Sequence, residues 1–444
     1  MKYTSLRTRA IHAGESARAP GGAVAPPLHM ANSYMTEADL SFSAERLTPD
    51  SPYIYTRWGN PTVSMLEKRV ASLEGSEEGL CFSSGMAAIT GLFTHLLGTG
   101  DHLVMSDVAY AGAVEYTYDL LPQMGVAVTH VDVSDLDAVR DALRPNTRLV
   151  HIETPCNPIL RLADIEQIAR LAHGVGALLS VDSTFASPVI TRPLMLGAGL
   201  VIHSLTKYLG GHGDALGGII VGRSELLARI RSRVGIHAGG ILSPFNAWLI
   251  LRGLTTLPLR MQAHCDSAMH IAAMLTQHPR VKRVIYPGLD SHPQYRLAQK
   301  QMRLPGGMLT FQADDGEKMA RQLQRRLQLV SYAVSLGHVH SLIYYIGTDS
   351  IMESTFHLRG GGLTAYKDYA GEVFSAFLWG WRIPMICAAT WHRRWANAWR
   401  RRTLNAQPLQ WCLAGRCLSR LPPGAGSLLL LRSLAGSAGC PATA

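Results

Sequence analysis

An aspartate and a lysine follow two short apolar runs in LLSVDSTFASPVITRPLMLGAGLVIHSLTKYLGGHGDALGGIIVG, residues 178–222. Asp182 ends the first run, and Ser204, Thr206 and Lys207 end the second. Short β-branched runs bounded by glycines and polar turns are typical of strands that are buried on both faces. Chemistry in open α/β sheets gathers at the carboxyl ends of such strands. A surface lysine and a helix-capping aspartate are the alternative, which the flanking hydroxyls and glycines fit poorly.

These residue types suit a cofactor that carries a carbonyl group. A lysine amine forms a Schiff base with an aldehyde, and pyridoxal 5'-phosphate (PLP) then serves as an electron sink for carbanions. An acidic residue such as Asp182, facing the pyridine nitrogen, keeps that nitrogen protonated. The hydroxyls of Ser204 and Thr206 can hold phosphate oxygens. We therefore expect PLP to be bound at Lys207.

Two motifs in this stretch, VDSTFASP and HSLTKYLGGHGD, resemble a family signature. They are similar to those of the PLP enzymes of cysteine and methionine metabolism: cystathionine γ-synthase, the cystathionine lyases and methionine γ-lyase. The similarity covers residues 8–372. It implies a fold-type I, aminotransferase-like α/β fold, with a mostly parallel, seven-stranded-type sheet flanked by helices and a smaller α+β C-terminal domain. It also implies a homodimer or homotetramer that acts on a small sulfur amino acid.

The resemblance assigns roles to residues that precede the lysine. Tyr55 and Arg57, in YIYTRWGNPT, would bind the cofactor phosphate in a neighbouring subunit, a task that suits the fork of a guanidinium. Surface stacking is the plain alternative for this pair. Ser84, Gly85 and Met86 would present backbone N–H groups at a helix N-terminus, which is a ready anion site. An ordinary strand-to-helix turn is the alternative there.

Further residues receive roles in the same way. Tyr110 would stack on the cofactor ring and exchange protons with the leaving group, although core packing also explains an aromatic residue at a strand end. Asn157, in ETPCNP, would hydrogen-bond the phenolic oxygen, or simply form an Asn-Pro turn. The backbone of Ser335 and Leu336 would help to hold the substrate carboxylate, or form a loop. Lys207 would be catalytic and shuttle protons between Cα, Cβ and the cofactor.

Composition limits the class of protein. The 444 residues are 47% hydrophobic and 17% charged, which suits a soluble α/β protein. No apolar run is long enough to cross a bilayer and the first residues lack the apolar core of a secretory signal, so we expect a cytoplasmic protein. Cys81, Cys156 and Cys265 show no metal-ligand spacing, which favours buried reduced thiols and predicts no metal site.

Pattern changes along the chain predict its domains. Residues 1–60 are expected to form an extended arm. Strand and helix patterns alternate across residues 61–250, which predicts a PLP-binding large domain, and TVSMLEKRVASLEG within it has helical apolar spacing. Residues 251–372 show an α+β pattern, which predicts a truncated small domain. Residues 373–444 form an aberrant basic tail rich in Trp and Arg.

The tail departs from the family. Residues 373–444 hold nine arginines, six tryptophans and no acidic residue. In the family, DYAGE is followed by a strand of the form GVFRFSVGLED, whose arginine clamps the substrate carboxylate; VFSAFLWGWRIP stands here instead. Deleting one G after the Glu372 codon of a family-like ending reproduces residues 372–386, so we hypothesise a shifted reading frame. The clamp would be missing, cofactor binding would survive better than turnover, and the small domain would lose its last strand and helix.

The type of reaction stays open between two classes. VSLG at residues 334–337 resembles methionine γ-lyase more than the ESLG of cystathionine γ-enzymes, which favours a carbon–sulfur lyase. Gly112 stands where methionine γ-lyases usually carry a reactive cysteine, which keeps a γ-replacement transferase as the alternative.

A different class of function follows from the tail, which could bind nucleic acid or an anionic membrane. Basic runs are more often solvated, so we expect neither partner; an inert product of a damaged gene is a further alternative.

Overall fold

The computed structural model describes residues 5–15, 22–38, 43–44 and 51–371, together with the backbone of the strand Val373–Phe377. All of these residues lie within one compact unit, Met1–Ala398. Of the basic tail predicted for residues 373–444, residues 378–444 lie outside the described residues. No helix in the described part of the chain has the length and apolar character needed to cross a bilayer.

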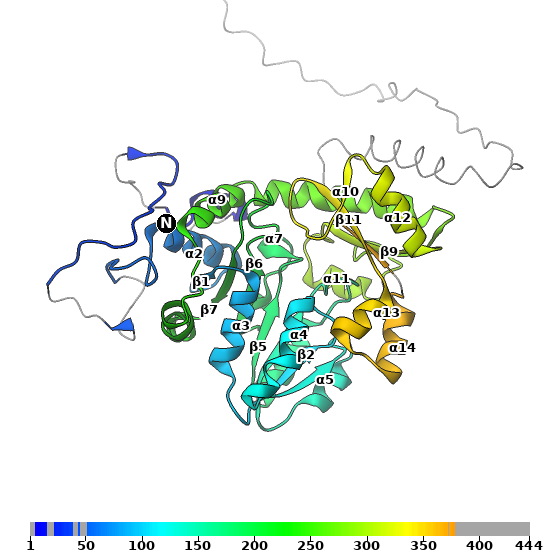
Figure 1. Cartoon of the computed structure of the whole chain (residues 1–444), viewed down its shortest axis with the longest axis horizontal. Helices are drawn as coiled ribbons and strands as arrows, with labels where there is room; N and C mark the ends of the chain where they lie inside the picture. The colour runs from blue at the N-terminus through cyan, green and yellow to red at the C-terminus, as the bar shows by residue number, and fades with distance from the viewer. Residues whose placement is uncertain (1–4, 16–21, 39–42, 45–50, 372, 378–444) are drawn as a thin grey trace, which may run out of the picture. The chain divides into compact units, whose positions relative to one another are not determined.

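A seven-stranded sheet forms the centre of the described residues, in the order β1-β7-β6-β5-β4-β2-β3. Its neighbours pair in parallel, except that β7 runs antiparallel to both β1 and β6. Every residue of β2 and of β7 is buried, because helices flank the sheet (Figure 1). Burial on both faces explains why these strands read as continuous apolar runs. The strands are β1 Glu78–Phe82, β2 His102–Ser106, β3 Ala127–Val131, β4 Thr147–Glu153, β5 Leu178–Asp182, β6 Leu200–Ser204 and β7 Gly218–Gly222.

The helix predicted from TVSMLEKRVASLEG is confirmed as α2, Pro61–Glu74. The side chain of Asn60 caps it by accepting from the N–H groups of Thr62 and Val63. Gly75 ends it in the left-handed conformation with φ 77°, which glycine adopts without strain. The other helices of this region are α3 Gly85–Leu96, α4 Ala111–Asp119, α5 Leu136–Ala142, α6 Ile165–Gly174, α7 Ser187–Ile190 and α8 Ser224–Ile230.

Two successive helices, α9 (Pro244–Leu254) and α10 (Leu257–Thr276), follow the large sheet. Helix α10 runs to a second sheet and packs on its strands β8 and β9 (Figure 1). That sheet has five strands in the order β10-β11-β12-β9-β8, mostly antiparallel. The domain boundaries at residues 60 and 250 stay predictions. The remaining elements are β8 Val281–Ile285, α11 Tyr295–Gln301, β9 Met308–Ala313, α12 Gly316–Arg326, β10 Val330–Tyr332, β11 Ser341–Ile346, α13 Thr348–Ile351, the π-helical turn η6 Met352–Phe356, α14 Gly360–Tyr369 and β12 Val373–Phe377.

The prediction that the small domain loses its last strand is wrong. Strand β12 pairs antiparallel with β11 on one side and with β9 on the other, so it lies inside the second sheet. Sheet pairing uses backbone N–H and C=O groups, which a change of residue type leaves in place. The last five described residues therefore continue the sheet beyond the expected truncation at residue 372.

The first residues also differ from the predicted extended arm. Residues Leu6–His12 form helix α1, which the hydroxyl of Ser5 caps by accepting from Thr8 N. Helix α1 packs on α2, where Arg9 Nη1 donates to the carbonyl of Ser72 at 3.1 Å. The helix is only two turns long, and helices of this length depend on such packing rather than on their own periodicity.

Candidate active site

A cavity of about 730 Å³ lies at the carboxyl ends of β4, β5 and β6 and is also walled by residues of the second sheet. All of the predicted site residues line it except Tyr55 and Arg57. The residues brought together are Ser84, Gly85, Met86, Tyr110, Asn157, Asp182, Ser204, Thr206, Lys207, Ser335 and Leu336. The carboxyl ends of the strands of the large sheet supply most of these residues, and the loop between β10 and β11 of the second sheet adds Ser335 and Leu336.

Lys207 is held by a loop of the second sheet. Its Nζ donates to Ser335 Oγ at 3.1 Å. Gly337 has φ 89°, and a Cβ there would lie 2.4 Å from Tyr208 N and 2.5 Å from Lys207 C, so the loop rests directly on the lysine backbone. Burial lowers the pKa of Lys207 from its ordinary value. A larger fraction of the amine is therefore unprotonated, which is the nucleophilic form.

Asp182 is a buried carboxylate that ends β5. Its Oδ1 accepts from Thr184 N at 2.9 Å. Burial raises the pKa of Asp182, while the hydrogen bonds from Thr184 and the proximity of His203 lower it. A buried carboxylate with this balance would be stabilised by a cationic group in the cavity, such as a protonated ring nitrogen.

The N-terminus of α3 forms another wall. Ser84 caps the helix, with its Oγ accepting from Ala87 N at 3.0 Å. The first N–H groups of a helix have no partner within it, and the helix dipole favours an anion there. A Cβ on Gly85 would lie 3.0 Å from Ser204 Cβ and 3.2 Å from its Oγ, so the Ser204 hydroxyl stands at this helix end. Together these groups form a cradle that fits a phosphate.

Thr206 differs from the other hydroxyl residues of the cavity. Its Oγ1 accepts from Gly217 N at 3.1 Å and lies 3.3 Å from Gly217 O. The hydroxyl therefore already holds the backbone that leads into β7. It still lines the cavity, and its role toward a phosphate stays a prediction.

Tyr110 stands at the start of α4 with 44% of its surface exposed. A Cβ on Gly112 would lie 3.1 Å from Tyr110 Cε1, so a cysteine at position 112 would require the tyrosine ring to shift.

Glu153 also lines the cavity, although it was not among the predicted site residues. It ends β4, is 4% exposed, and accepts from Tyr110 N at 2.6 Å and from Asn157 N at 2.8 Å. Burial and the neighbouring Asp182 carboxylate raise the pKa of Glu153, and the two amides oppose the shift. The feature of the sequence that could have indicated Glu153 is its position in ETPCNP, as an acidic residue at the end of a parallel strand.

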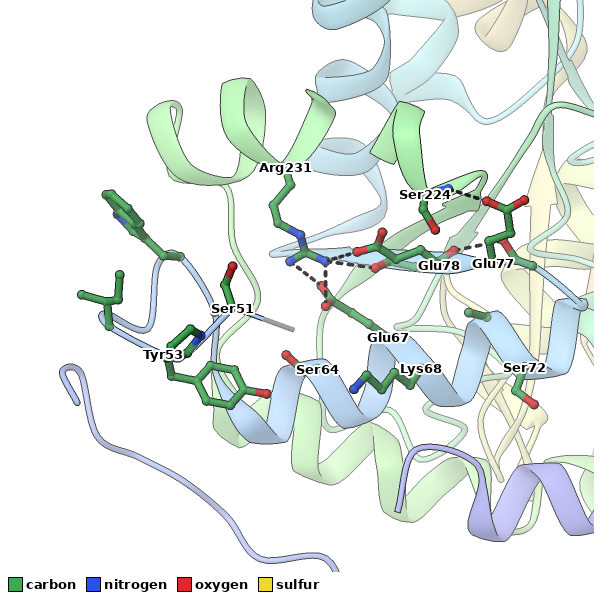
Figure 2. A pocket seen from close by; sticks show the side chains of 17 residues that line it. Ser51, Tyr53, Ser64, Glu67, Lys68, Ser72, Glu77, Glu78, Ser224 and Arg231 are labelled. Carbon is green, nitrogen blue, oxygen red and sulfur yellow. Dashed lines mark hydrogen bonds and ion pairs between the residues drawn. The ribbon is translucent and has the colours of Figure 1, made fainter. Parts of the chain in front are cut away.

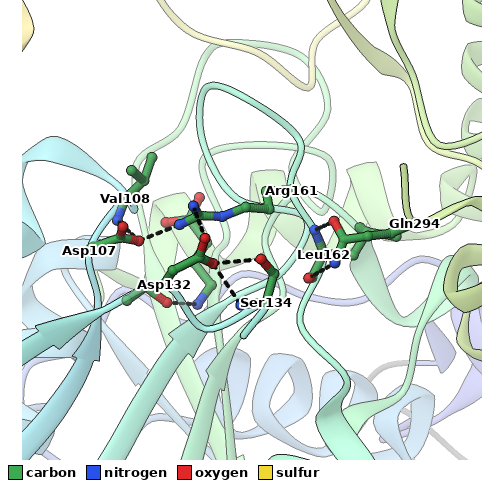
Figure 3. Close-up of polar contacts among 9 residues, drawn as sticks. Asp107, Val108, Asp132, Ser134, Arg161, Leu162 and Gln294 are labelled. Atoms are coloured by element: carbon green, nitrogen blue, oxygen red, sulfur yellow. Dashed lines mark hydrogen bonds and ion pairs between the residues drawn. The ribbon is translucent and has the colours of Figure 1, made fainter. Parts of the chain in front are cut away.

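A network of ion pairs and hydrogen bonds links the loops that carry Tyr110 and Asn157 (Figure 3). Arg161 forms an ion pair with Asp107, just before Tyr110, and another with Asp132 at 2.7 Å. Gln294 accepts from Leu162 N at 2.7 Å. The loop that carries Asn157 is thus tied to the loop that carries Tyr110.

Comparison with known proteins decides the family. The model of the Cys/Met metabolism PLP-dependent enzymes matches residues 7–359. The chain belongs to this family. A canavanine γ-lyase of Pseudomonas canavaninivorans is 42% identical over 348 residues, which are 78% of this chain and 86% of the relative. An L-methionine γ-lyase of Fusobacterium nucleatum subsp. nucleatum is 41% identical over 348 residues, which are 78% of this chain and 88% of the relative.

Solved structures of the family agree with the fold. The crystal structure of metB from Corynebacterium glutamicum matches with a TM-score of 0.80 and 36% identity, covering 89% of this chain and 98% of that one. The cystathionine γ-lyase of Lactobacillus plantarum, complexed with L-serine, matches with a TM-score of 0.78 and 34% identity, covering 88% and 99%. The fold-type I prediction is confirmed.

The cofactor of this family is PLP, and the cavity fits it. Lys207 offers an amine with a lowered pKa, Asp182 offers a buried carboxylate, and the N-terminus of α3 offers a phosphate cradle. These groups belong to different elements, and the cavity holds all of them. The predicted cofactor is therefore confirmed at the level of the family, and the role of each residue toward it stays a prediction.

Tyr55 and Arg57 lie away from this cavity. Arg57 Nη1 donates to Ile236 O at 2.6 Å, and its guanidinium carbon stands 5.5 Å from the centre of the Tyr55 ring. Tyr55 is 41% exposed. The family resemblance places this pair in a neighbouring subunit's site, and that placement stays a prediction.

A second cavity, of about 390 Å³, lies beside α2 (Figure 2). Arg231 forms ion pairs with Glu67 and Glu78 there, both at 3.0 Å, and Glu67 also accepts from Cys81 N at 2.9 Å. The single guanidinium offsets only one of these two negative charges. Glu67 is a buried carboxylate outside the Lys207 cavity, which makes it a useful control position.

Proposed function

We propose that this chain is a carbon–sulfur lyase that carries out γ-elimination on a sulfur amino acid of the methionine or cystathionine type. The observation that carries the proposal is the position of Lys207 Nζ in the cavity, 3.1 Å from Ser335 Oγ. The γ-lyase names of several relatives at about 40% identity support elimination over replacement. We place the enzyme in the cytoplasm, as its sequence predicts.

Each side chain has a task in this proposal. PLP, when bound, supplies the electron sink that stabilises negative charge on the substrate carbons. Lys207 moves protons at its Nζ, and the Ser335 hydroxyl orients that nitrogen. Asp182 would hold the protonated ring nitrogen, and Tyr110 would pack on the ring.

The remaining cavity residues hold and orient the two ligands. We assign the phosphate to the backbone of Gly85 and Met86 and to the hydroxyls of Ser84, Ser204 and Thr206. The Asn157 amide would hydrogen-bond the ring oxygen. Ser335 and Leu336 contact the substrate carboxylate through their backbone.

The substrate carboxylate lacks the family's arginine clamp in this proposal. Ser375 and Ala376 stand where the hypothesised frame shift removes that arginine, and in β12 they pair with Tyr344 and Ile343 of β11. Tyr344 and Ile343 both line the Lys207 cavity. An arginine in this part of β12 would thus stand beside the site, and its absence supports reduced turnover.

Product analysis tests the type of reaction. Incubation of PLP-loaded enzyme with L-methionine, and in parallel with cystathionine, is expected to give an α-keto acid, ammonia and a thiol. Mass spectrometry and an ammonia assay measure these products. A thioether formed from an activated homoserine and a thiol, without ammonia, would instead establish a γ-replacement transferase.

If each site is shared between two subunits, mixing two variants that are each defective in PLP binding should restore tight PLP binding. Lys207→Ala removes the amine, and Arg57→Ala is expected to weaken PLP binding about 10- to 100-fold, because a charge-assisted contact to phosphate is lost. Random mixing of the two variants forms hybrid dimers, in which one of the two sites receives Lys207 from one chain and Arg57 from the other. About a quarter of all sites should then bind PLP tightly, as counted by borohydride-fixed cofactor per chain at low PLP concentration.

The control for this experiment uses the same variants without exchange of chains. Each variant alone should retain almost no fixed cofactor at that PLP concentration. Mixed samples that never exceed the average of the separate variants, despite exchange of tagged chains, would contradict the shared site.

A further inference from the structure

We propose that Glu153 is a positioning residue that holds Tyr110 and Asn157 in one fixed arrangement. Its Oε2 accepts from Tyr110 N at 2.6 Å and its Oε1 accepts from Asn157 N at 2.8 Å. One buried carboxylate thus binds the backbone of both residues that we assign to the cofactor ring and its oxygen. The inference rests on the proposed function of the cavity.

The two residues belong to separate segments, which the ion pair between Arg161 and Asp107 also ties together. Tyr110 begins α4 after β2, and Asn157 follows β4. Glu153 is the last residue of β4, a strand inside the seven-stranded sheet, so its backbone is fixed by pairing with β5. The Glu153 side chain extends from this fixed backbone and hydrogen-bonds both segments. A small rotation of either segment would break one of these two hydrogen bonds.

A carboxylate is the side chain that can do this. Each oxygen accepts one N–H, so both acceptors are used. Glutamine has nearly the same shape but only one acceptor oxygen, and its NH₂ group would face a backbone N–H. Aspartate keeps the charge but is one methylene shorter, so it cannot reach both amides from the same backbone position. Glu153→Gln therefore tests the negative charge of the side chain, and Glu153→Asp tests its length.

The position of Glu153 next to Asp182 supports a role in the site rather than in general stability. The two residues are direct partners across β4 and β5, and both line the cavity. Two buried carboxylates side by side repel each other, which is unfavourable for folding alone. The arrangement becomes useful when a ligand requires groups from both strands at once.

Glu153→Gln tests the inference, with PLP as the probe and Glu67→Gln as the matched control. Glu67 is 5% exposed and also accepts a backbone N–H, but it does not line this cavity. We expect Glu153→Gln to weaken PLP binding about 10-fold or more and to lower the visible circular dichroism per bound cofactor at least about twofold, because the ring loses its fixed orientation. Glu67→Gln should leave both quantities unchanged, even if its melting temperature falls.

Each outcome decides the inference. PLP affinity and circular dichroism of Glu153→Gln equal to those of the unmodified chain would overturn it, as would equal losses in Glu67→Gln. If Glu153→Gln does not fold, Glu153→Asp decides: intermediate losses support the inference, and unmodified behaviour overturns it. Failure of the unmodified chain itself to bind PLP would instead overturn the proposed function.

Discussion

Replacing Lys207 by alanine is expected to lower turnover at least about 10³-fold, because the variant loses both its covalent anchor for the cofactor and its proton carrier. Steady-state assays of α-keto acid release under saturating PLP measure the effect. Lys300→Ala is the matched control, because Lys300 is a lysine outside the cavity that pairs with Glu166 at 3.0 Å. Turnover of Lys207→Ala within tenfold of the unmodified chain would contradict the role of Lys207.

The thermal stability of the Lys207→Ala variant distinguishes a catalytic role of Lys207 from a structural role. Burial lowers the pKa of Lys207, so between that lowered value and its ordinary value the unfolded chain holds more protons than the folded chain. The contribution of Lys207 to stability therefore rises with pH across this window and is least favourable below it. At neutral pH the cofactor-free Lys207→Ala variant should melt no lower than the unmodified cofactor-free chain.

Restoring the hypothesised reading frame after Glu372 is expected to raise kcat/KM by about 30-fold to several thousand-fold. The basis is the roughly 2–5 kcal/mol that a buried, charge-assisted pair contributes when one partner would otherwise be left alone. PLP affinity should change by less than about threefold, because the cofactor contacts come from residues that both chains share. Parallel kinetics and PLP titration of the two chains measure these effects.

A chain that ends after Phe377 is the control for the restored frame. It keeps β12 in the second sheet but lacks the basic tail. If it gains as much activity as the restored chain, the tail inhibits the enzyme and the missing arginine is not the cause. Equal turnover in all three chains would contradict the arginine hypothesis.

Much of the site could be predicted from local sequence. Asp182 and Lys207 each follow an apolar run, and strand ends of a parallel sheet meet at one edge, so their shared cavity follows from pattern alone. Ser84 was predicted to lie at a helix N-terminus, and it caps α3. These features depend on residues that are adjacent in the sequence, so local sequence patterns predict them.

Long-range contacts could not be predicted in this way. Glu153 acts on Tyr110 N, 43 positions away, through a backbone amide that has no residue-type signature. The hydroxyl of Thr206 accepts a hydrogen bond from Gly217 N, because the turn before β7 brings the two residues together. Strand β12 forms although its residues depart from the family, since pairing with β9 and β11 depends on the backbone.

Lys207 is proposed as the residue that holds the cofactor. Borohydride reduction of the PLP-loaded chain, followed by proteolysis and mass spectrometry, locates the fixed cofactor. We predict one phosphopyridoxyl group per chain, on the peptide that contains Lys207. A protein that shows no visible absorbance with PLP, or a label on another lysine that persists in Lys207→Ala, would contradict the account.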